Sequence, residues 1–393
     1  MRYLILFLSV FFTFDSFCTT DYISEIRIIS KNYVSLWKDG HSQTVHSACR
    51  LAKYVKDDLQ ADYLRFPVAN SFYQNNRSHI DLILKHDSSG NPIKAPLLVL
   101  VSGIFGEPFG GIASHLVKRF SDQGFHVLSL GNPLGKSNLV DKPRYPLAHF
   151  IKEARAYYEK IKAARINLQR LGLIEGKASI YGISYGAFTS AVVKKIDRNE
   201  HIKKLILISP PKNFGLAITN MDNLVKESKK YKNYPDWMFP LMSIPFCLNP
   251  PKKLTHKKAQ RAKAIFTFSG FQRGLADQIS YADKLFHWGF VPRHSKDAYN
   301  QWRKNLTFNY YFENFFPSLK RLYYSPLANL FYWISLNDEN VIILSSYDDV
   351  LNNGVSWPKH ERIFLIKTGG HYGFANSEFY ERFLSLAGNW LKI

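Results

Sequence analysis

Residues 182–186, with the sequence GISYG, place a serine between two glycines in the pattern G-x-S-x-G. The pattern alone arises easily by chance, but here it follows the apolar run 178–181 and opens the helix-forming segment 187–195. A strand, a tight turn and a helix are the setting that projects a nucleophilic serine above a sheet. Glycines flank such a turn because side chains there would collide with neighbouring backbone. We therefore predict that Ser184 is a nucleophile rather than part of an ordinary strand-to-helix turn.

A serine hydroxyl is a poor nucleophile until a base removes its proton. Of the thirteen histidines, His371 lies in the glycine-rich turn 368–373, after an apolar run and before the last predicted helix. Such a turn allows an imidazole to reach over the sheet to the serine. The base in turn needs an acid that orients it. Asp348 and Asp349 follow the apolar run 340–346. The local pattern favours Asp349, with Asp348 as the alternative acid or as a cap of the turn.

A negatively charged oxygen that forms during acyl transfer needs amide donors nearby. Segment 101–106, VSGIFG, leaves the apolar run 97–101 and leads towards a predicted helix. This position suits a glycine loop that offers one backbone N–H, while the second comes from the residue after the nucleophile. We assign the oxyanion hole to the amides of Tyr185 and Ile104, with Phe105 as the alternative to Ile104. A glycine-rich turn of this kind is also common in any doubly wound sheet.

The elements that must position these residues follow a regular alternation along the chain. Continuous apolar runs are typical of strands that are buried on both faces of a parallel sheet. Strands are predicted at 63–68, 79–85, 97–101, 125–130, 178–181, 204–209, 340–345 and 362–366, and helices at 112–123, 146–171, 187–195 and 377–391. This alternation predicts a doubly wound, mostly parallel sheet.

Two parts of the chain interrupt or precede the alternation. Residues 211–337 are rich in proline, lysine and aromatics without strand rhythm, and residues 19–62 have apolar residues at helical spacing. We predict an N-terminal helical cover at 19–62, a core formed by 63–210 and 338–393, and a helical cap inserted at 211–337.

In the order and setting of these motifs, the chain resembles the α/β-hydrolase family. The resemblance is carried by residues 102–106, 182–186, 348–349 and 369–371. It implies the α/β-hydrolase fold with an inserted helical cap, a Ser-Asp-His order of the triad, and neither a metal nor an organic cofactor. Members usually begin the oxyanion loop with His-Gly, whereas this chain has Ser102-Gly103. The family includes esterases, lipases, thioesterases, peptidases and non-enzymes, so the fold does not name the substrate.

The expected function is that of a serine hydrolase that cleaves a carboxylic ester, with lipids among the candidate substrates. The lipid hypothesis rests on the aromatic-rich segments 310–317 and 322–333 beside Lys320 and Arg321, since aromatics with basic residues suit a membrane interface or an acyl chain. The alternative is that these aromatics form the core of the cap. One alternative is cleavage of a thioester or peptide by the same triad. Another is a secreted binding protein that has the same fold but no catalytic activity.

The charge of the chain is strongly positive. Fifty-two lysines and arginines face 31 aspartates and glutamates, a formal net charge of +21, with the densest basic stretches at 227–232 and 252–263. Such an excess favours anionic partners such as an acidic membrane surface, although it also describes a solvated basic surface. The sequence has no specific nucleic-acid-binding motif.

Residues 1–18 have the pattern of a signal peptide. Arg2 precedes the apolar run 3–14, and small residues follow at positions 16 and 18. We predict a secreted or periplasmic protein, with an uncleaved membrane anchor as the alternative. Removal of the signal leaves Cys49 and Cys247, which can pair in an oxidising compartment or remain free thiols.

Overall fold

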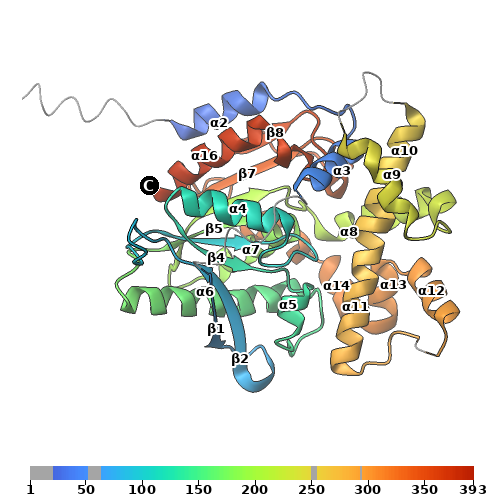
Figure 1. The fold of residues 1–393 in the computed structure, drawn as a ribbon, viewed down its shortest axis with the longest axis horizontal. Helices are drawn as coiled ribbons and strands as arrows, with labels where there is room; N and C mark the ends of the chain where they lie inside the picture. Colours follow the sequence, from blue (N-terminus) through green and yellow to red (C-terminus); the bar gives the residue numbers. More distant parts are fainter. Residues whose placement is uncertain (1–20, 52–62, 249–254, 293) are drawn as a thin grey trace, which may run out of the picture.

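The computed structural model describes residues 21–51, 63–248, 255–292 and 294–393. The predicted signal peptide, 1–18, lies outside the described residues. Within the predicted N-terminal cover, the structure describes two helices, α2 (Tyr22–Lys31) and α3 (Gly40–Leu51). Figure 1 shows α2 along one face of the sheet and α3 at one end of it.

The described part of the chain forms one eight-stranded sheet in the order β1-β2-β4-β3-β5-β6-β7-β8. Strand β2 pairs antiparallel with β1 and with β4, and all neighbours from β4 to β8 are parallel. Every residue of β3, β4, β5 and β7 is buried, as their continuous apolar runs predict. The strands are β1 (Tyr63–Ala69), β2 (Arg77–Ile83), β3 (Leu97–Val101), β4 (His126–Leu130), β5 (Ala178–Ile183), β6 (Ile202–Ile208), β7 (Val341–Ser346) and β8 (Ile363–Ile366).

Helices cover both faces of the sheet (Figure 1). Helices α4 (Gly111–Asp122), α16 (Glu378–Lys392) and α2 pack on one face, and α6 (Phe150–Arg170) and α7 (Tyr185–Ile196) pack on the other. Strand β3 shows the division, because Leu98 and Leu100 join the first core and the alternating residues Leu97, Val99 and Val101 join the second. Side chains of a strand point alternately to its two faces, so one apolar run supplies both cores.

All described elements between β6 and β7 are helical and gather at one end of the sheet (Figure 1). The aromatics of 310–317 and 322–333 contribute Tyr311, Phe312, Tyr323 and Trp333 to the buried core of this region. The longer helices are α8 (Phe214–Glu227), α9 (Met238–Cys247), α10 (His256–Ala264), the π-helix η4 (Ile265–Gln272), α11 (Arg273–Phe286), α12 (Lys296–Asn305), α13 (Phe308–Phe315) and α14 (Pro317–Tyr323), and the short α15 (Leu330–Trp333) follows.

This mostly parallel sheet with helices on both faces and a helical insertion after β6 is the predicted α/β-hydrolase fold. Most boundaries differ from the prediction by no more than two residues, and the largest difference is at the helix predicted from residue 146, which begins at Phe150. Ala148 has a φ of 69°, which is incompatible with a right-handed helix and delays its start. Within the described ranges, no helix combines the length and apolarity that crossing a membrane requires.

Candidate active site

Ser184 occupies the sharp turn between β5 and α7, with φ 53° and ψ −121°. A positive φ is strained for a residue with a side chain. Both flanking glycines are sterically required. A Cβ on Gly186 would lie 2.3 Å from the carbonyl oxygen of Ser102, and a Cβ on Gly182 would lie 2.7 Å from Cα of Ala187. The turn thus holds Ser184 directly after the carboxyl end of β5.

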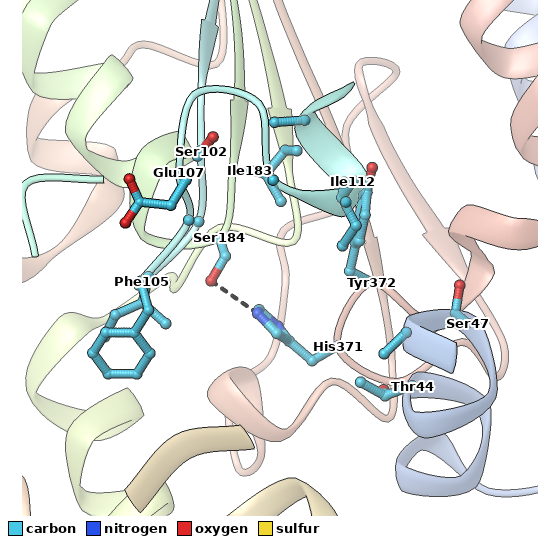
Figure 2. Close-up of a pocket in the computed structure, with 17 residues that line it drawn as sticks. Thr44, Ser47, Ser102, Phe105, Glu107, Ile112, Ile183, Ser184, His371 and Tyr372 are labelled. Atoms are coloured by element: carbon cyan, nitrogen blue, oxygen red, sulfur yellow. Dashed lines mark hydrogen bonds between the residues drawn. The ribbon is translucent and has the colours of Figure 1, made fainter. Parts of the chain in front are cut away.

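His371 connects Ser184 to Asp349. Its Nε2 lies 2.8 Å from Ser184 Oγ, and its Nδ1 lies 3.0 Å from Asp349 Oδ1 (Figure 2 shows the first contact). Asp349 is fully buried, whereas 15% of the His371 side chain is exposed. When Nδ1–H donates to the buried carboxylate, Nε2 is left as the acceptor for the serine hydroxyl. This arrangement is the one that proton transfer from Ser184 requires.

The two adjacent aspartates have different partners. Asp348 Oδ1 accepts hydrogen bonds from the backbone N–H groups of Gly369 and Gly370, each at 2.8 Å. The structure therefore brings Asp349, the favoured acid of the sequence prediction, to the histidine. Asp348 instead fixes the glycine turn that carries His371.

The predicted oxyanion loop lies directly beside the serine. A Cβ on Gly103 would be 3.3 Å from Ser184 Cβ, and the Gly106 N–H closes the turn on the Gly103 carbonyl at 2.9 Å. Phe105 has a φ of 61° within this turn. Ile104 lines the same cavities as Ser184. The roles of the Ile104 and Tyr185 amides as donors remain a prediction.

Two cavities meet at Ser184 and His371. The first, of about 490 Å³, is drawn in Figure 2, and the second, of about 250 Å³, extends under the helical insertion. Polar and apolar residues both line the first, and the hydroxyls of Ser47 and Ser102 are themselves buried. The second is walled mainly by apolar side chains, namely Phe214, Ala217, Ile218, Met221, Phe266, Phe271, Phe308 and Leu351.

Helix α3 forms a wall of both cavities, a role that its sequence did not indicate. Thr44 and Ala48 line the first cavity and the second. The Gln43 side chain donates to the Gly373 carbonyl at 2.7 Å. The helix also packs closely on the histidine turn, since a Cβ on Gly370 would lie 2.0 Å from the Gly40 carbonyl oxygen. Helix α3 therefore supports His371 as well as enclosing the site.

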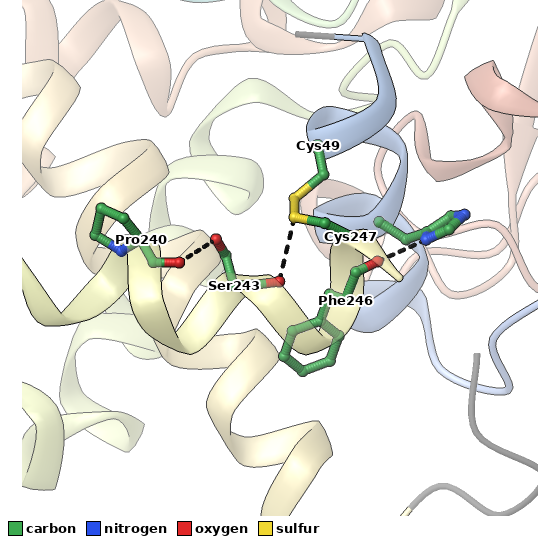
Figure 3. The surroundings of a disulfide bond; sticks show 6 residues. Cys49, Pro240, Ser243, Phe246 and Cys247 are labelled. Atoms are coloured by element: carbon green, nitrogen blue, oxygen red, sulfur yellow. Dashed lines mark hydrogen bonds between the residues drawn. A yellow bond between two sulfur atoms is a disulfide. The ribbon is translucent and has the colours of Figure 1, made fainter. Parts of the chain in front are cut away.

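A disulfide joins α3 to the helical insertion. Cys49 at the end of α3 is bonded to Cys247 at the end of α9, with 5.3 Å between their Cα atoms (Figure 3). A second contact places Nδ1 of His46 2.6 Å from the Phe246 carbonyl oxygen. The sequence left pairing and free thiols open, and the structure pairs the two cysteines. The bond fastens a wall of both cavities to α9.

A buried carboxyl lies beneath the nucleophile turn. Glu153 is fully buried on α6, where it accepts hydrogen bonds from the Ala148 N–H at 2.7 Å and from the Tyr185 hydroxyl. Burial raises the pKa of Glu153 to about 8, although both hydrogen bonds lower it. The sequence did not single out this residue, because a glutamate in the first turn of a helix is ordinary. Glu153 anchors the side chain of the residue that follows Ser184.

Across the described residues, no group of three or more histidine, cysteine or acidic side chains is placed to hold a metal ion.

Comparisons with known proteins find only distant structural likenesses. No family model and no curated protein matches the chain. Similar solved structures include the α/β hydrolase GrgF from Penicillium sp. sh18, with a TM-score of 0.44 and 12% identity over 84% of this chain and 98% of that one. Carboxyl esterase 2 from Tuber melanosporum has a TM-score of 0.44 and 12% identity over 86% and 88%. An esterase from Pyrobaculum calidifontis has a TM-score of 0.41 and 15% identity over 89% and 90%. At such low sequence identity, the fold assignment depends on the strand order of this chain, and any proposal of activity depends on the geometry of its site.

Proposed function

We propose that the protein is a serine hydrolase that cleaves carboxylic esters with an apolar acyl group. The observation that carries the proposal is His371, which lies within hydrogen-bond distance of both Ser184 and the buried Asp349 where two cavities meet. Three such groups in this arrangement convert a weak hydroxyl into a nucleophile.

In the proposed reaction, Ser184 Oγ attacks the acyl carbon while its proton moves to His371 Nε2. The amides of Ile104 and Tyr185 hold the resulting oxyanion, and each such donor contributes about 3–4 kcal/mol to the transition state. The C–O bond to the leaving group then breaks, and the imidazolium returns the proton to the departing alcohol. Water, deprotonated by His371, attacks the acyl-enzyme, which releases the acid and restores the serine.

The two cavities suggest how an ester would lie across the site. We place the acyl chain in the second cavity, because apolar side chains form most of its wall. Burial of a methylene contributes about 0.8 kcal/mol, so this wall favours longer acyl groups. The leaving alcohol then occupies the first, larger cavity, whose wall mixes apolar residues with Thr44 and Glu107. A lipid ester would fit this division, with its alcohol part in the first cavity.

The decisive test is labelling with a fluorophosphonate probe, which reacts with activated serines. We expect the wild-type protein to be labelled, and Ser184→Ala and His371→Ala to remain unlabelled although folded. An unlabelled wild type with a normal circular dichroism spectrum would overturn the hydrolase proposal and favour a binding protein. Hydrolysis of thioesters or peptides, with no ester turnover by a labelled protein, would keep the triad and replace the substrate class.

The placement of the acyl chain has its own test in a series of p-nitrophenyl esters. Ala217→Phe narrows the second cavity and should lower kcat/KM more for long than for short acyl chains. Ser47→Leu narrows the first cavity and serves as the matched control. A change in chain-length preference with Ser47→Leu alone would exchange the two assignments.

We further propose that the protein works outside the reducing cytosol, in a secreted or periplasmic location. The bond between Cys49 and Cys247 supports this location, since stable disulfides form in oxidising compartments. Thiol alkylation of the protein from its native source, before any reduction, should leave both cysteines unmodified. Alkylation of both would place the protein in a reducing compartment.

A further inference from the structure

Helix α9 exposes a row of large apolar side chains to solvent. Trp237 and Leu248, just before and just after the helix, are 65% and 61% exposed, and Leu241 and Ile244 within it are 56% and 51% exposed. Their spacing of four, three and four residues places them on one helical face, which we name the apolar ridge. Residues 237–248 contain no charged side chain. An exposed apolar face of this extent is uncommon on a monomer and marks an interaction surface.

Basic residues flank the apolar ridge on both sides. Among the described residues of 226–263, eight are lysine or arginine, of which Lys226, Lys229, Lys230 and Lys257 are exposed. The two acidic residues of this span are already neutralised, because Glu227 pairs with a lysine of α10 and Asp236 pairs with an arginine of α12. The segments that flank the ridge in the sequence therefore carry an excess of positive charge, and charge complementarity calls for an anionic partner.

Helix α9, which carries the ridge, is covalently linked to a wall of the candidate active site. The disulfide at the end of α9 fastens this helix to α3, which lines both cavities (Figure 3). On the other side, α10 continues directly into η4, which supplies Phe266 and Phe271 to the second cavity. Figure 1 shows α9 and α10 at the outer end of the molecule, with α3 between them and the sheet.

We propose that the apolar ridge of α9 docks this protein on the surface of an anionic lipid bilayer. Apolar side chains on one face of a helix enter the boundary between headgroups and acyl chains, and nearby lysines are attracted to anionic headgroups. A membrane accounts for both features at once, whereas a protein partner would have to supply matching apolar and acidic groups. The inference goes beyond ester hydrolysis and does not depend on it. Among the aromatics of 308–333, Tyr324 and Tyr332 are 53% and 52% exposed and the others are buried or partly buried, so α9 carries the larger exposed apolar face.

Binding is measured with the full-length Ser184→Ala protein, so that turnover plays no part. The probe is co-sedimentation with vesicles of phosphatidylcholine alone or of phosphatidylcholine mixed with phosphatidylglycerol. We expect binding to the mixed vesicles that weakens as salt is raised. Leu241→Ser with Ile244→Ser should lower this affinity about tenfold, equivalent to about 1.4 kcal/mol. Leu171→Ser, at an equally exposed position on the end of α6, is the matched control and should bind normally.

The electrostatic part is tested by Lys229→Gln with Lys257→Gln, which should reduce binding to the mixed vesicles several-fold at low salt. The matched control is Lys152→Gln with Lys195→Gln, which removes two exposed lysines elsewhere on the surface and should leave binding unchanged.

Three outcomes would overturn the proposal. The folded protein would bind neither kind of vesicle, the control variants would lose as much affinity as the ridge variants, or the ridge variants would convert a dimer to a monomer without affecting vesicle binding. The last result would identify the ridge as a contact between two copies of the chain. Turnover of a water-soluble ester separates this proposal from the hydrolase proposal, because soluble substrate needs no docking.

Discussion

The neighbouring residues Asp348 and Asp349 offer a matched pair of substitutions that removes the same charge at adjacent positions. In Asp349→Asn, the amide oxygen can still accept the Leu351 N–H, which lies 2.9 Å from Oδ1, and the amide nitrogen then takes the place of Oδ2, 3.2 Å from His371 Nδ1. An amide nitrogen donates and cannot accept, so it favours the tautomer in which Nδ1 has lost its proton and Nε2 carries one. A protonated Nε2 cannot accept the proton of Ser184, so the histidine is held in the wrong tautomer.

The expected magnitude follows from this change of tautomer. Replacement of the triad aspartate by asparagine lowers kcat about 10⁴-fold in a serine protease. At 1.36 kcal/mol for each factor of ten, this loss corresponds to about 5.5 kcal/mol of transition-state stabilisation. In Asp348→Asn, the side-chain oxygen can still accept from the Gly369 and Gly370 N–H groups but without a charge. Loss of charge assistance costs about 1–3 kcal/mol of stability, and we expect kcat/KM to fall less than tenfold.

The assay is kcat/KM for a p-nitrophenyl ester, together with the rate of fluorophosphonate labelling and the urea midpoint of each variant. Asp349→Asn should lose activity while it keeps most of its stability, and Asp348→Asn should show the opposite pattern. Equal losses of activity in both variants would mean that the aspartates act by fixing the turn that carries His371, and not by the direct contact of Asp349 with the imidazole. A greater loss in Asp348→Asn would refute the assignment of Asp349.

Three further predictions concern the scaffold. Gly186→Ala places a Cβ against two backbone carbonyls and should destabilise the fold by about 3 kcal/mol or more, whereas Gly270→Ala, with open space around it, should not; thermal melting compares them. The pKa of Glu153 is raised from 4.5 to about 8, so between these pH values the folded chain keeps a proton that the unfolded chain loses. The free energy of unfolding should therefore fall as the pH rises from about 4.5 to 8, by up to about 1.36 kcal/mol per pH unit. Glu153→Gln should remove this fall in urea titrations, and an unchanged slope would contradict the buried carboxyl. Cys49→Ser with Cys247→Ser opens a link between residues 198 apart and should cost about 2–5 kcal/mol; reduction of the wild type should reproduce the loss in the same titration.

The parts of the site that the sequence predicted are those fixed by local backbone geometry. The turn at Ser184 needs glycine on both sides because strand and helix backbone pass within 3 Å of those positions, and that requirement is written in five consecutive residues. The strand rhythm is equally local, because burial on both faces demands an uninterrupted apolar run. The fold class and the choice of Ser184 and His371, which the structure places 2.8 Å apart, could therefore be made without a structure.

Other features depend on which distant segments meet. Asp348 and Asp349 are chemically identical neighbours, and only the path of the turn after β7 decides which carboxylate faces His371. The pairing of Cys49 with Cys247 and the role of α3 as a cavity wall join the N-terminal segment to the helical insertion, across most of the chain. Amphipathic spacing shows that a helix has a buried face but does not show what that face covers.

The exposed face of α9 and the buried Glu153 are two places where the composition of the sequence does not predict burial. An apolar stretch is ordinarily buried and a glutamate is ordinarily exposed, so composition predicts the reverse of what the structure has at both places. The sequence alone determined the chemistry of the reacting groups, since that chemistry resides in residue types and tight turns. The tertiary structure decided which acid serves the histidine, what encloses the substrate and which surface stays open, because these depend on long-range packing.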